Sequence, residues 1–230
     1  TLLAAKDVKT LPFAGVDVPR LRACTADYYN CIRRLDTGIG MVLESLAHAG
    51  RAQNALVIYL GDHGPQFPRG KHSCYEGALR VPLIVRWPKR AKEGFVSDKL
   101  VATVDLLPTI LEAVGAKPPA GLAGRSMVRL LQSDVAPWPE YVFAEYHSAS
   151  PQFYFPQRTV RDARHKLIVN LLKDRANPQP TTLVLRSLPA RILPSDVAAA
   201  SEEVRRAYAT WEDAPPVELY DLENDPYEFK

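Results

Sequence analysis

A continuous apolar run that stops at a polar turn is the feature that most constrains this chain. Residues 54–60 read NALVIYL and include the β-branched Val57 and Ile58. A run of this length predicts a strand that is buried on both faces, as in a parallel sheet. Residues 61–65, GDHGP, end that strand. An Asp and a His therefore follow the strand's carboxyl end, where open α/β sheets bind their ligands.

The segments around this strand predict an α/β layer architecture. A cap-type Asp17 and a Pro at position 19 start a long amphipathic helix, which ends near Gly50. Residues 81–87 and the apolar run 100–104 read as further short strands, and residues 105–114 as a helix.

The pattern changes after about residue 135. One helix is expected at residues 195–211, and short strands are expected at residues 141–146, 159–161, 166–171 and 217–220. We therefore expect an α/β part over residues 1–135 and a small C-terminal α+β subdomain over residues 136–230.

Charge and cysteine content narrow the classes of function. The formal net charge is +3, too close to neutral for a nucleic-acid or membrane-surface partner. No apolar run approaches the roughly 20 residues that span a bilayer. Cys24 and Cys31 are seven positions apart in the expected helix, which separates them by about 10 Å and predicts that they do not form a disulfide. Cys74 is left over, and no cysteine has metal-finger spacing.

Asp62 and His63 are candidate metal ligands, because a carboxylate beside an imidazole can hold a divalent cation. Lys71 follows nine positions later between Gly70 and His72, and a lysine beside a metal suits an anionic oxygen of a substrate. The residues alone leave two interpretations open. A Gly-Asp-x-Gly stretch is also typical of a plain turn, and a lone lysine is also typical of a solvated surface.

Seven segments carry a resemblance to a known family: YYNCI at residues 28–32, GDHG at 61–64, GK at 70–71, YEG at 75–77, RVPL at 80–83, DLLPTIL at 105–111 and ELYDL at 218–222. Through these segments the chain resembles the second half of a sulfatase, in the alkaline-phosphatase-like superfamily. The resemblance covers nearly the whole chain in family order, and the stretch 167–171 with residues 160–161 is similar to the heparan N-sulfatase branch.

The resemblance implies roles at the matching positions. Asp62 and His63 fall where the family places two ligands of its metal ion, which implies Ca²⁺, with Mg²⁺ or Mn²⁺ as alternatives. Many sulfatases have Asn in place of His63, and imidazole is an unusual ligand for a hard cation that prefers oxygen. Lys71 matches the basic residue that contacts the sulfate, which implies a catalytic and substrate-binding role. His147 is a candidate for facing the substrate, and a plain polar residue at a strand end is the competing interpretation.

The resemblance also implies parts that this chain lacks. Sulfatases use a formylglycine made within a Cys/Ser-x-Pro/Ala-x-Arg motif, which Cys24, Cys31 and Cys74 do not fit. We therefore expect a C-terminal portion of a sulfatase that hydrolyses a sulfate ester or sulfamate, and that is inactive by itself. A phosphodiesterase or phosphonate monoester hydrolase of the same superfamily, or an inactive binding fragment, is the alternative. The expected partner is a small-molecule or saccharide sulfate, without nucleic acid or membrane. The compartment and the oligomeric state stay open, and export or a periplasmic location is compatible with the resemblance.

Overall fold

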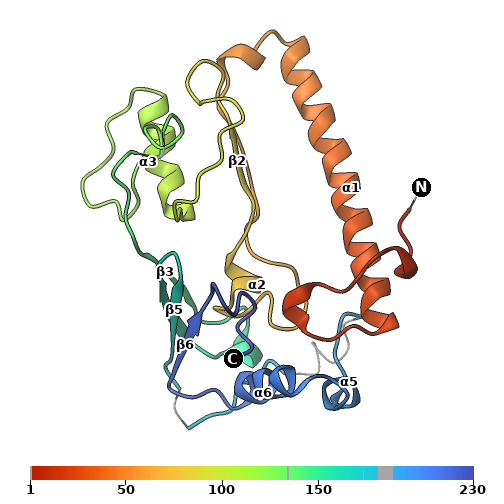
Figure 1. The fold of residues 1–230 in the computed structure, drawn as a ribbon. Helices are drawn as coiled ribbons and strands as arrows, with labels where there is room; N and C mark the ends of the chain where they lie inside the picture. Colours follow the sequence, from red (N-terminus) through yellow and green to blue (C-terminus); the bar gives the residue numbers. More distant parts are fainter. Residues whose placement is uncertain (1, 134, 173, 181–188) are drawn as a thin grey trace. The chain divides into compact units, whose positions relative to one another are not determined.

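The described part of the chain forms two compact units (Figure 1). The computed structural model describes residues 2–133, 135–172, 174–180 and 189–230. We call the parts the two-stranded unit, which comprises residues 42–61 and 82–142, and the four-stranded unit, which comprises residues up to 41, 62–81 and 143–230. The predicted domain boundary near residue 135 stays a prediction.

The two-stranded unit corrects the expected parallel pairing of the apolar run. Strand β1 (Val57–Leu60) pairs antiparallel with β2 (Leu83–Arg86), so that Val57 lies opposite Arg86. All four residues of β1 are half-buried, so the expectation of burial on both faces was wrong as well. A short apolar run fixes neither the direction of its partner nor the cover on its faces, because both come from distant segments.

A second difference in this unit concerns residues 100–104, where the predicted strand is absent from the described structure. Thr103–Asp105 forms a 3₁₀ turn instead and leads into helix α3 (Leu106–Ala113), which confirms the predicted helix. The Asp105 carboxylate explains the turn, because it accepts hydrogen bonds from the backbone N–H groups of Ala102 at 2.9 Å and Arg125 at 2.8 Å. A side chain that satisfies backbone donors in this way competes with strand pairing.

Helix α1 (Pro19–His48) confirms the long amphipathic helix. It is followed by Gly50, whose φ of 68° lies in the left-handed region that favours glycine after a helix. Its apolar stripe is only partly covered: Leu21 is fully buried, whereas Leu35 and Val42 are 48% and 67% exposed. Cys24, Cys31 and Cys74 are all free thiols, as the spacing of the first two predicted. No described helix combines the length and the apolarity needed to cross a membrane.

The four-stranded unit combines a sheet and helices from residues 143–230 with the segments up to residue 41 and 62–81, so it is not a purely C-terminal part. Its sheet has the order β3-β4-β5-β6, with antiparallel pairing of β4 with β5 and of β5 with β6. Side chains alternate between the two faces of a strand, and the covered face of this sheet is largely polar. The strands are β3 (Val142–Tyr146), β4 (Gln157–Arg161), β5 (His165–Asn170) and β6 (Val217–Asp221).

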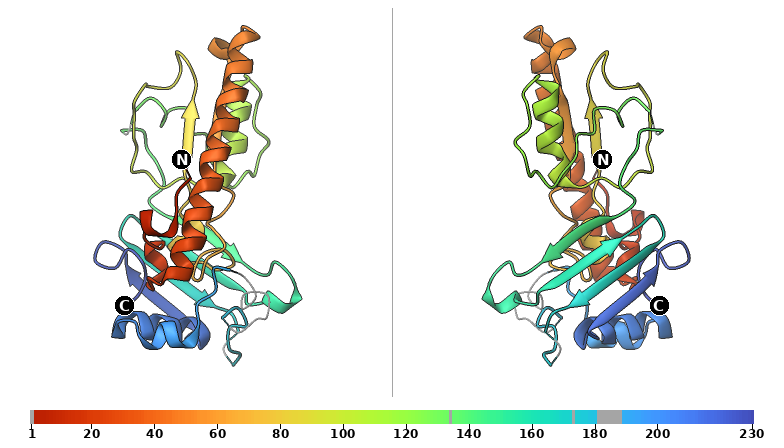
Figure 2. Two further views of the ribbon diagram at one scale, coloured as in Figure 1. Left: turned by 90° about the vertical axis from the view of Figure 1, so that its right-hand side faces the viewer. Right: turned by 90° about the vertical axis from the view of Figure 1, so that its left-hand side faces the viewer.

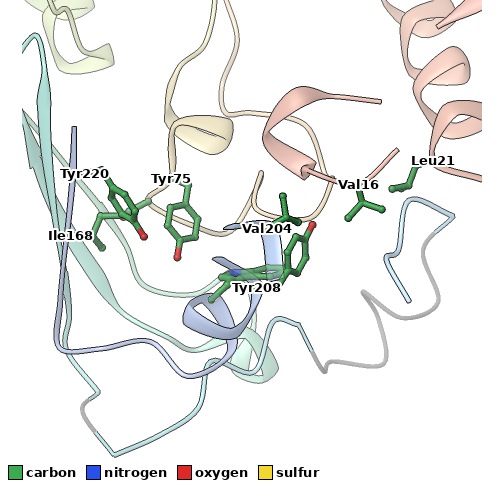
Figure 3. Packing of buried hydrophobic residues seen from close by; sticks show 9 residues of the cluster. Val16, Leu21, Tyr75, Ile168, Val204, Tyr208 and Tyr220 are labelled. Atoms are coloured by element: carbon green, nitrogen blue, oxygen red, sulfur yellow. The ribbon is translucent and has the colours of Figure 1, made fainter. Parts of the chain in front are cut away.

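The single helix expected at residues 195–211 is two helices, α5 (Pro194–Ala198) and α6 (Glu202–Glu212). Ser201 separates them, because its hydroxyl accepts a hydrogen bond from the Val204 N–H and so starts α6. Helix α6 lies along the sheet (Figure 2). Its apolar face joins the buried cluster shown in Figure 3, whose members are Val16, Leu21, Cys74, Tyr75, Ile168, Val204, Tyr208, Trp211 and Tyr220.

Candidate active site

Asp62 and His63 lie side by side in the turn that follows β1. The Nε2 atom of His63 is 3.3 Å from Oδ2 of Asp62, and Oδ1 of Asp62 accepts a hydrogen bond of 3.0 Å from the His63 backbone N–H. Both side chains reach solvent, with 87% of the Asp62 side chain and 42% of the His63 side chain exposed. The pair is therefore open to a ligand.

The contact on the other side of the His63 ring indicates which nitrogen carries the proton. Nδ1 is 2.9 Å from the carbonyl oxygen of Gly64, and a carbonyl oxygen only accepts hydrogen bonds. The neutral ring therefore has its proton on Nδ1, and its Nε2 lone pair faces the Asp62 carboxylate. The Nε2 lone pair and the Asp62 carboxylate are both hydrogen-bond acceptors. They repel each other unless a positive charge, either a proton or a metal cation, lies between them.

The pair fits part of a divalent cation site. A carboxylate and a neutral imidazole held through its other nitrogen are the donor types found around protein-bound metals. Among the described residues, however, no group of three or more His, Cys, Asp or Glu side chains gathers around one point. The metal role of Asp62 and His63 therefore stays a prediction, and within the described residues no third His, Cys, Asp or Glu side chain joins the pair.

The glycines of this segment allow a very close approach of the backbone. A Cβ on Gly64 would lie 1.8 Å from the carbonyl oxygen of Gly77, at the start of helix α2 (Glu76–Leu79). The Gly64 N–H donates to the carbonyl of Ala78 at 2.7 Å. The chain after His63 thus folds back onto α2, and only a residue without a side chain fits at position 64.

Lys71 lies in a tight turn of the same loop. Its backbone N–H donates to the carbonyl of Pro65 at 3.0 Å, and a Cβ on Gly70 would lie 2.3 Å from that carbonyl oxygen. The Lys71 side chain is half-buried and has no hydrogen bond or ion pair within the described residues. Its ammonium is therefore available to an anion.

His72 lies at the centre of this loop. Burial lowers the pKa of its ring, and the neighbouring Lys71 and His63 side chains lower it further. The ring is stacked on Phe153, with centroids 5.0 Å apart, and lies 6.0 Å from the ring of Tyr146. The structure thus brings His63 and Lys71 near one buried imidazole.

His147 is the predicted site residue with the weakest link to this loop. It follows Tyr146 at the end of β3, but its Nε2 lies 3.4 Å from Oε2 of Glu145, and more than half of its side chain is exposed. It is next to a shallow groove of about 570 Å³, whose lining includes a Tyr and an Arg. The role of His147 in substrate binding stays a prediction. The residues that line the groove are Ser148, Ala149, Ser150, Pro151, Tyr154 and Arg175.

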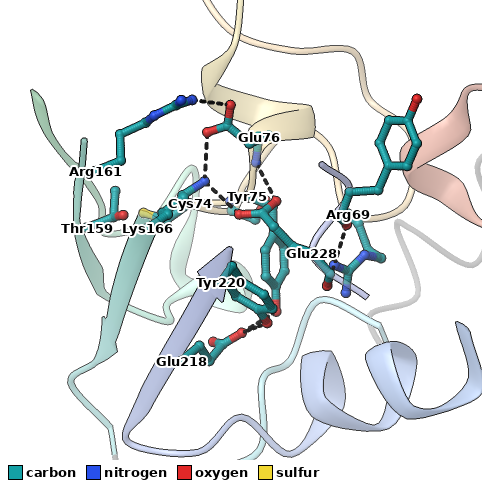
Figure 4. A network of polar contacts seen from close by, with 12 residues as sticks. Arg69, Cys74, Tyr75, Glu76, Thr159, Arg161, Lys166, Glu218, Tyr220 and Glu228 are labelled. Carbon is teal, nitrogen blue, oxygen red and sulfur yellow. Dashed lines mark hydrogen bonds and ion pairs between the residues drawn. The ribbon is translucent and has the colours of Figure 1, made fainter. Parts of the chain in front are cut away.

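Sequence reasoning missed a buried network of charged and polar side chains that holds this loop (Figure 4). Lys166, fully buried on β5, pairs with Glu76 at 3.2 Å and with Glu228 at 2.8 Å. Arg161 donates to Glu76 at 2.5 Å, and the Glu76 N–H donates to Glu228 at 2.7 Å. The residues of this network come from distant segments, so no single stretch of sequence predicts it. The sequence contains only an indirect indication, a period-two pattern in β5 that puts lysine and asparagine on the buried face.

A second part of this network surrounds Glu218 on β6. One of its carboxylate oxygens accepts hydrogen bonds from the hydroxyls of Tyr75 at 2.9 Å and Tyr220 at 2.5 Å, and the other accepts from the Asn170 amide at 2.8 Å. Gln157 continues the chain by donating to Asn170 and accepting from the Cys74 N–H. The motif ELYDL therefore has a structural role that follows from its contacts: it holds the segment after Lys71.

Comparison with known proteins relates this chain to sulfatases. Residues 14–116 match the sulfatase family model. An ulvan-active sulfatase of Formosa agariphila is 31% identical over 229 residues, which covers 97% of this chain and 42% of the relative. The human N-sulphoglucosamine sulphohydrolase is 30% identical over 237 residues, covering 95% of this chain and 45% of that protein. The chain therefore spans less than half the length of these curated relatives.

The solved structures give the same fold. A protein in complex with its substrate D-glucosamine-2-N,6-O-disulfate aligns with a TM-score of 0.65 over 92% of this chain and 36% of its own, at 23% sequence identity. This chain therefore has the α/β fold of these neighbours. This chain is therefore similar to sulfatases, over residues 14–116 by the family model and over nearly its whole length by the two relatives.

Proposed function

We propose that this chain supplies the C-terminal portion of a sulfatase that hydrolyses a sulfate ester or sulfamate on a saccharide. The observation that carries the proposal is one short loop that contains the exposed acceptor pair of Asp62 and His63 and, nine positions after Asp62, the Lys71 ammonium, which has no ion pair within the described residues. Further support comes from the two relatives, one named for its action on ulvan and one for N-sulphoglucosamine.

In this proposal each side chain of the loop has a separate task. Asp62 and His63 hold a divalent cation, with Ca²⁺ favoured and Mg²⁺ or Mn²⁺ as alternatives, and a bound cation supplies positive charge that polarises a sulfuryl oxygen. Lys71 donates to a second oxygen of the same group and stabilises the negative charge that develops there. His147 contributes to the substrate side of the site.

The nucleophile is proposed to be a formylglycine outside this chain. None of its three cysteines stands in the required motif; Ser187 does, in SLPAR at residues 187–191, but it lies downstream of residues 14–116, whereas the resemblance implies a nucleophile upstream of that stretch. Cys74 is also unsuitable as a thiolate nucleophile, because burial raises the pKa of its thiol to about 12. The 230-residue chain alone is therefore expected to be inactive.

The test compares the full-length protein with this chain on matched esters. We expect the full-length protein to hydrolyse an aryl sulfate or an N-sulfated or O-sulfated glucosamine faster than the corresponding aryl phosphate and phosphonate monoester. The chain alone should not exceed a buffer blank. Preference for phosphate or phosphonate would instead support the alternative hydrolase class, and sulfate turnover by the chain alone would contradict the assignment of the nucleophile.

A further inference from the structure

The turn that carries Lys71 has two non-glycine residues in a disfavoured backbone conformation. Arg69 has a φ of 62° and His72 a φ of 76°, both in the left-handed region that side chains with a Cβ avoid. Such conformations persist only where the surrounding structure determines them, and they cluster at functional sites. The question is therefore what holds residues 69–72 in place.

The first end of the turn is held by the Arg69 side chain, which is 1% exposed. Its guanidinium donates to the backbone carbonyls of Ala207 at 3.1 Å, Tyr227 at 3.2 Å and Glu228 at 2.6 Å. It also lies over the ring of Tyr75, 4.2 Å from the centroid. These contacts tie the turn to α6 and to residues 227–228. Figure 4 shows Arg69 beside Glu228.

The other end of the turn is held through His72. Its carbonyl accepts a hydrogen bond from the buried Gln179 amide, and its ring is stacked on Phe153. Ser73 closes the turn by donating to the Gly70 carbonyl at 2.8 Å. Lys71 lies between two fixed ends, and within the described residues its ammonium has no hydrogen-bond or ion-pair partner.

We infer that Arg69 is a positioning residue that fixes the Lys71 ammonium by tying its turn to residues 227–228. This inference rests on the proposed role of Lys71. It adds that Arg69 determines where the Lys71 ammonium lies. Lysine cannot replace Arg69 in this task, because one ammonium does not reproduce a planar fork that donates to three carbonyls. Arg69 touches no substrate in this scheme and acts only through the turn.

The test is a double-mutant cycle in the full-length protein, with Arg69→Lys and Lys71→Ala measured on one sulfate substrate. We expect Arg69→Lys to lower kcat/KM by roughly tenfold to a hundredfold, the scale of a misplaced group. In the Lys71→Ala background the same change should have almost no further effect, because the group that it misplaces is gone. The inference would be overturned if Arg69→Lys lowered kcat/KM equally with and without Lys71→Ala, or if Arg69→Lys had wild-type activity.

Two further variants separate positioning from folding. Phe229→Leu leaves Arg69 intact and removes an aromatic ring that lies 5.3 Å from its guanidinium. We expect this variant to lower kcat/KM less than Arg69→Lys does, and to have almost no effect when Lys71 is already alanine. Leu21→Ala, a cavity in the core cluster on α1, should lower the melting temperature without any dependence on Lys71. The effect of Leu21→Ala on kcat/KM should be the same with and without Lys71→Ala. If it depends on Lys71 as strongly as the effect of Arg69→Lys does, Arg69 has no specific role.

A readout without catalysis distinguishes this inference from the proposed function. A short pulse of an acetylating reagent, followed by mass spectrometry, measures the reactivity of Lys71 with the exposed Lys99 as internal control. Arg69→Lys should raise the acetylation of Lys71 severalfold and leave Lys99 unchanged. If the wild type hydrolyses no sulfate but Arg69→Lys still raises the acetylation of Lys71, the proposed function fails and the positioning role stands. If the wild type is active and the shift is absent, the positioning role fails.

Discussion

The ammonium of Lys166 lies 2.8 Å from a carboxylate oxygen of Glu228, and these side chains are 0% and 1% exposed. Glu76, 10% exposed, is the second carboxylate on the same ammonium at 3.2 Å. The loop that contains Lys71 is thus held by charges that are shielded from solvent. Charges in such surroundings depend on their partners, because an unpaired buried charge is strongly unfavourable.

Lys166→Met should destabilise the protein by about 3–5 kcal/mol, because it leaves the buried Glu228 without its cation. Adding Glu228→Gln should recover part of this loss, since a neutral amide is less costly to bury. Chemical denaturation of the single and double variants measures both effects. Equal stability of Lys166→Met and wild type would show that the network contributes nothing to folding.

The destabilisation by Lys166→Met should depend on pH. Burial raises the pKa of Glu228 above its ordinary value of 4.5, and Lys166 opposes that rise, so the variant should raise the pKa further. A carboxyl with a raised folded-state pKa stabilises the fold below its unfolded pKa, and this contribution is lost as the pH rises through the folded pKa. The difference in unfolding free energy between wild type and variant should therefore shrink as the pH falls toward 4.5. A difference that grows on acidification would contradict this assignment.

Lys71→Ala in the full-length protein should lower kcat/KM for a sulfate substrate by about two to three powers of ten, the scale of removing one electrostatic stabiliser. Lys71→Arg should be milder, because the charge is retained while the geometry changes. Steady-state kinetics on one substrate compares them, with Lys99→Ala as the surface control. A wild-type rate for Lys71→Ala would mean that Lys71 is an ordinary surface lysine.

Metal content should depend on Asp62 and His63. Asp62→Asn and His63→Leu should each weaken Ca²⁺ binding by roughly tenfold or more, because each removes a donor atom. His63→Asn should retain binding, because an amide oxygen is a harder ligand than imidazole. Calorimetric titration of the metal-free full-length protein provides the measurement, with Glu44→Gln on α1 as control. Unchanged affinity in both disruptive variants would rule out this pair as ligands.

The three thiols should react with iodoacetamide in a fixed order, Cys31 first and Cys74 last. Cys31 is exposed on α1, whereas burial raises the pKa of Cys24 and raises that of Cys74 to about 12. Only the thiolate reacts, so at neutral pH Cys74 should remain unmodified until the protein unfolds. Peptide mapping with and without denaturant reads the order, and early modification of Cys74 would contradict the packing around it.

Local patterns predicted α1, α3 and the strands of the C-terminal sheet, because helix and strand periodicities are written into neighbouring residues. They did not predict the antiparallel partner of β1, which a segment more than 20 residues later provides. The same distinction between neighbouring and distant residues applies to the candidate site. Asp62, His63 and Lys71 were found in one stretch of sequence, whereas Arg69 was missed because its partners lie 138 to 159 residues away.

The contact between Arg69 and the Glu228 carbonyl has a consequence for the order of events during synthesis. The two residues are separated by 159 positions. A ribosome adding about 5–20 residues per second needs roughly 8–32 seconds to cover that distance. During this interval the Lys71 turn has been made but lacks its anchor. The nascent protein therefore acquires a fixed Lys71 turn only after residues 227–228 have emerged, so premature termination before them would leave the loop without its support.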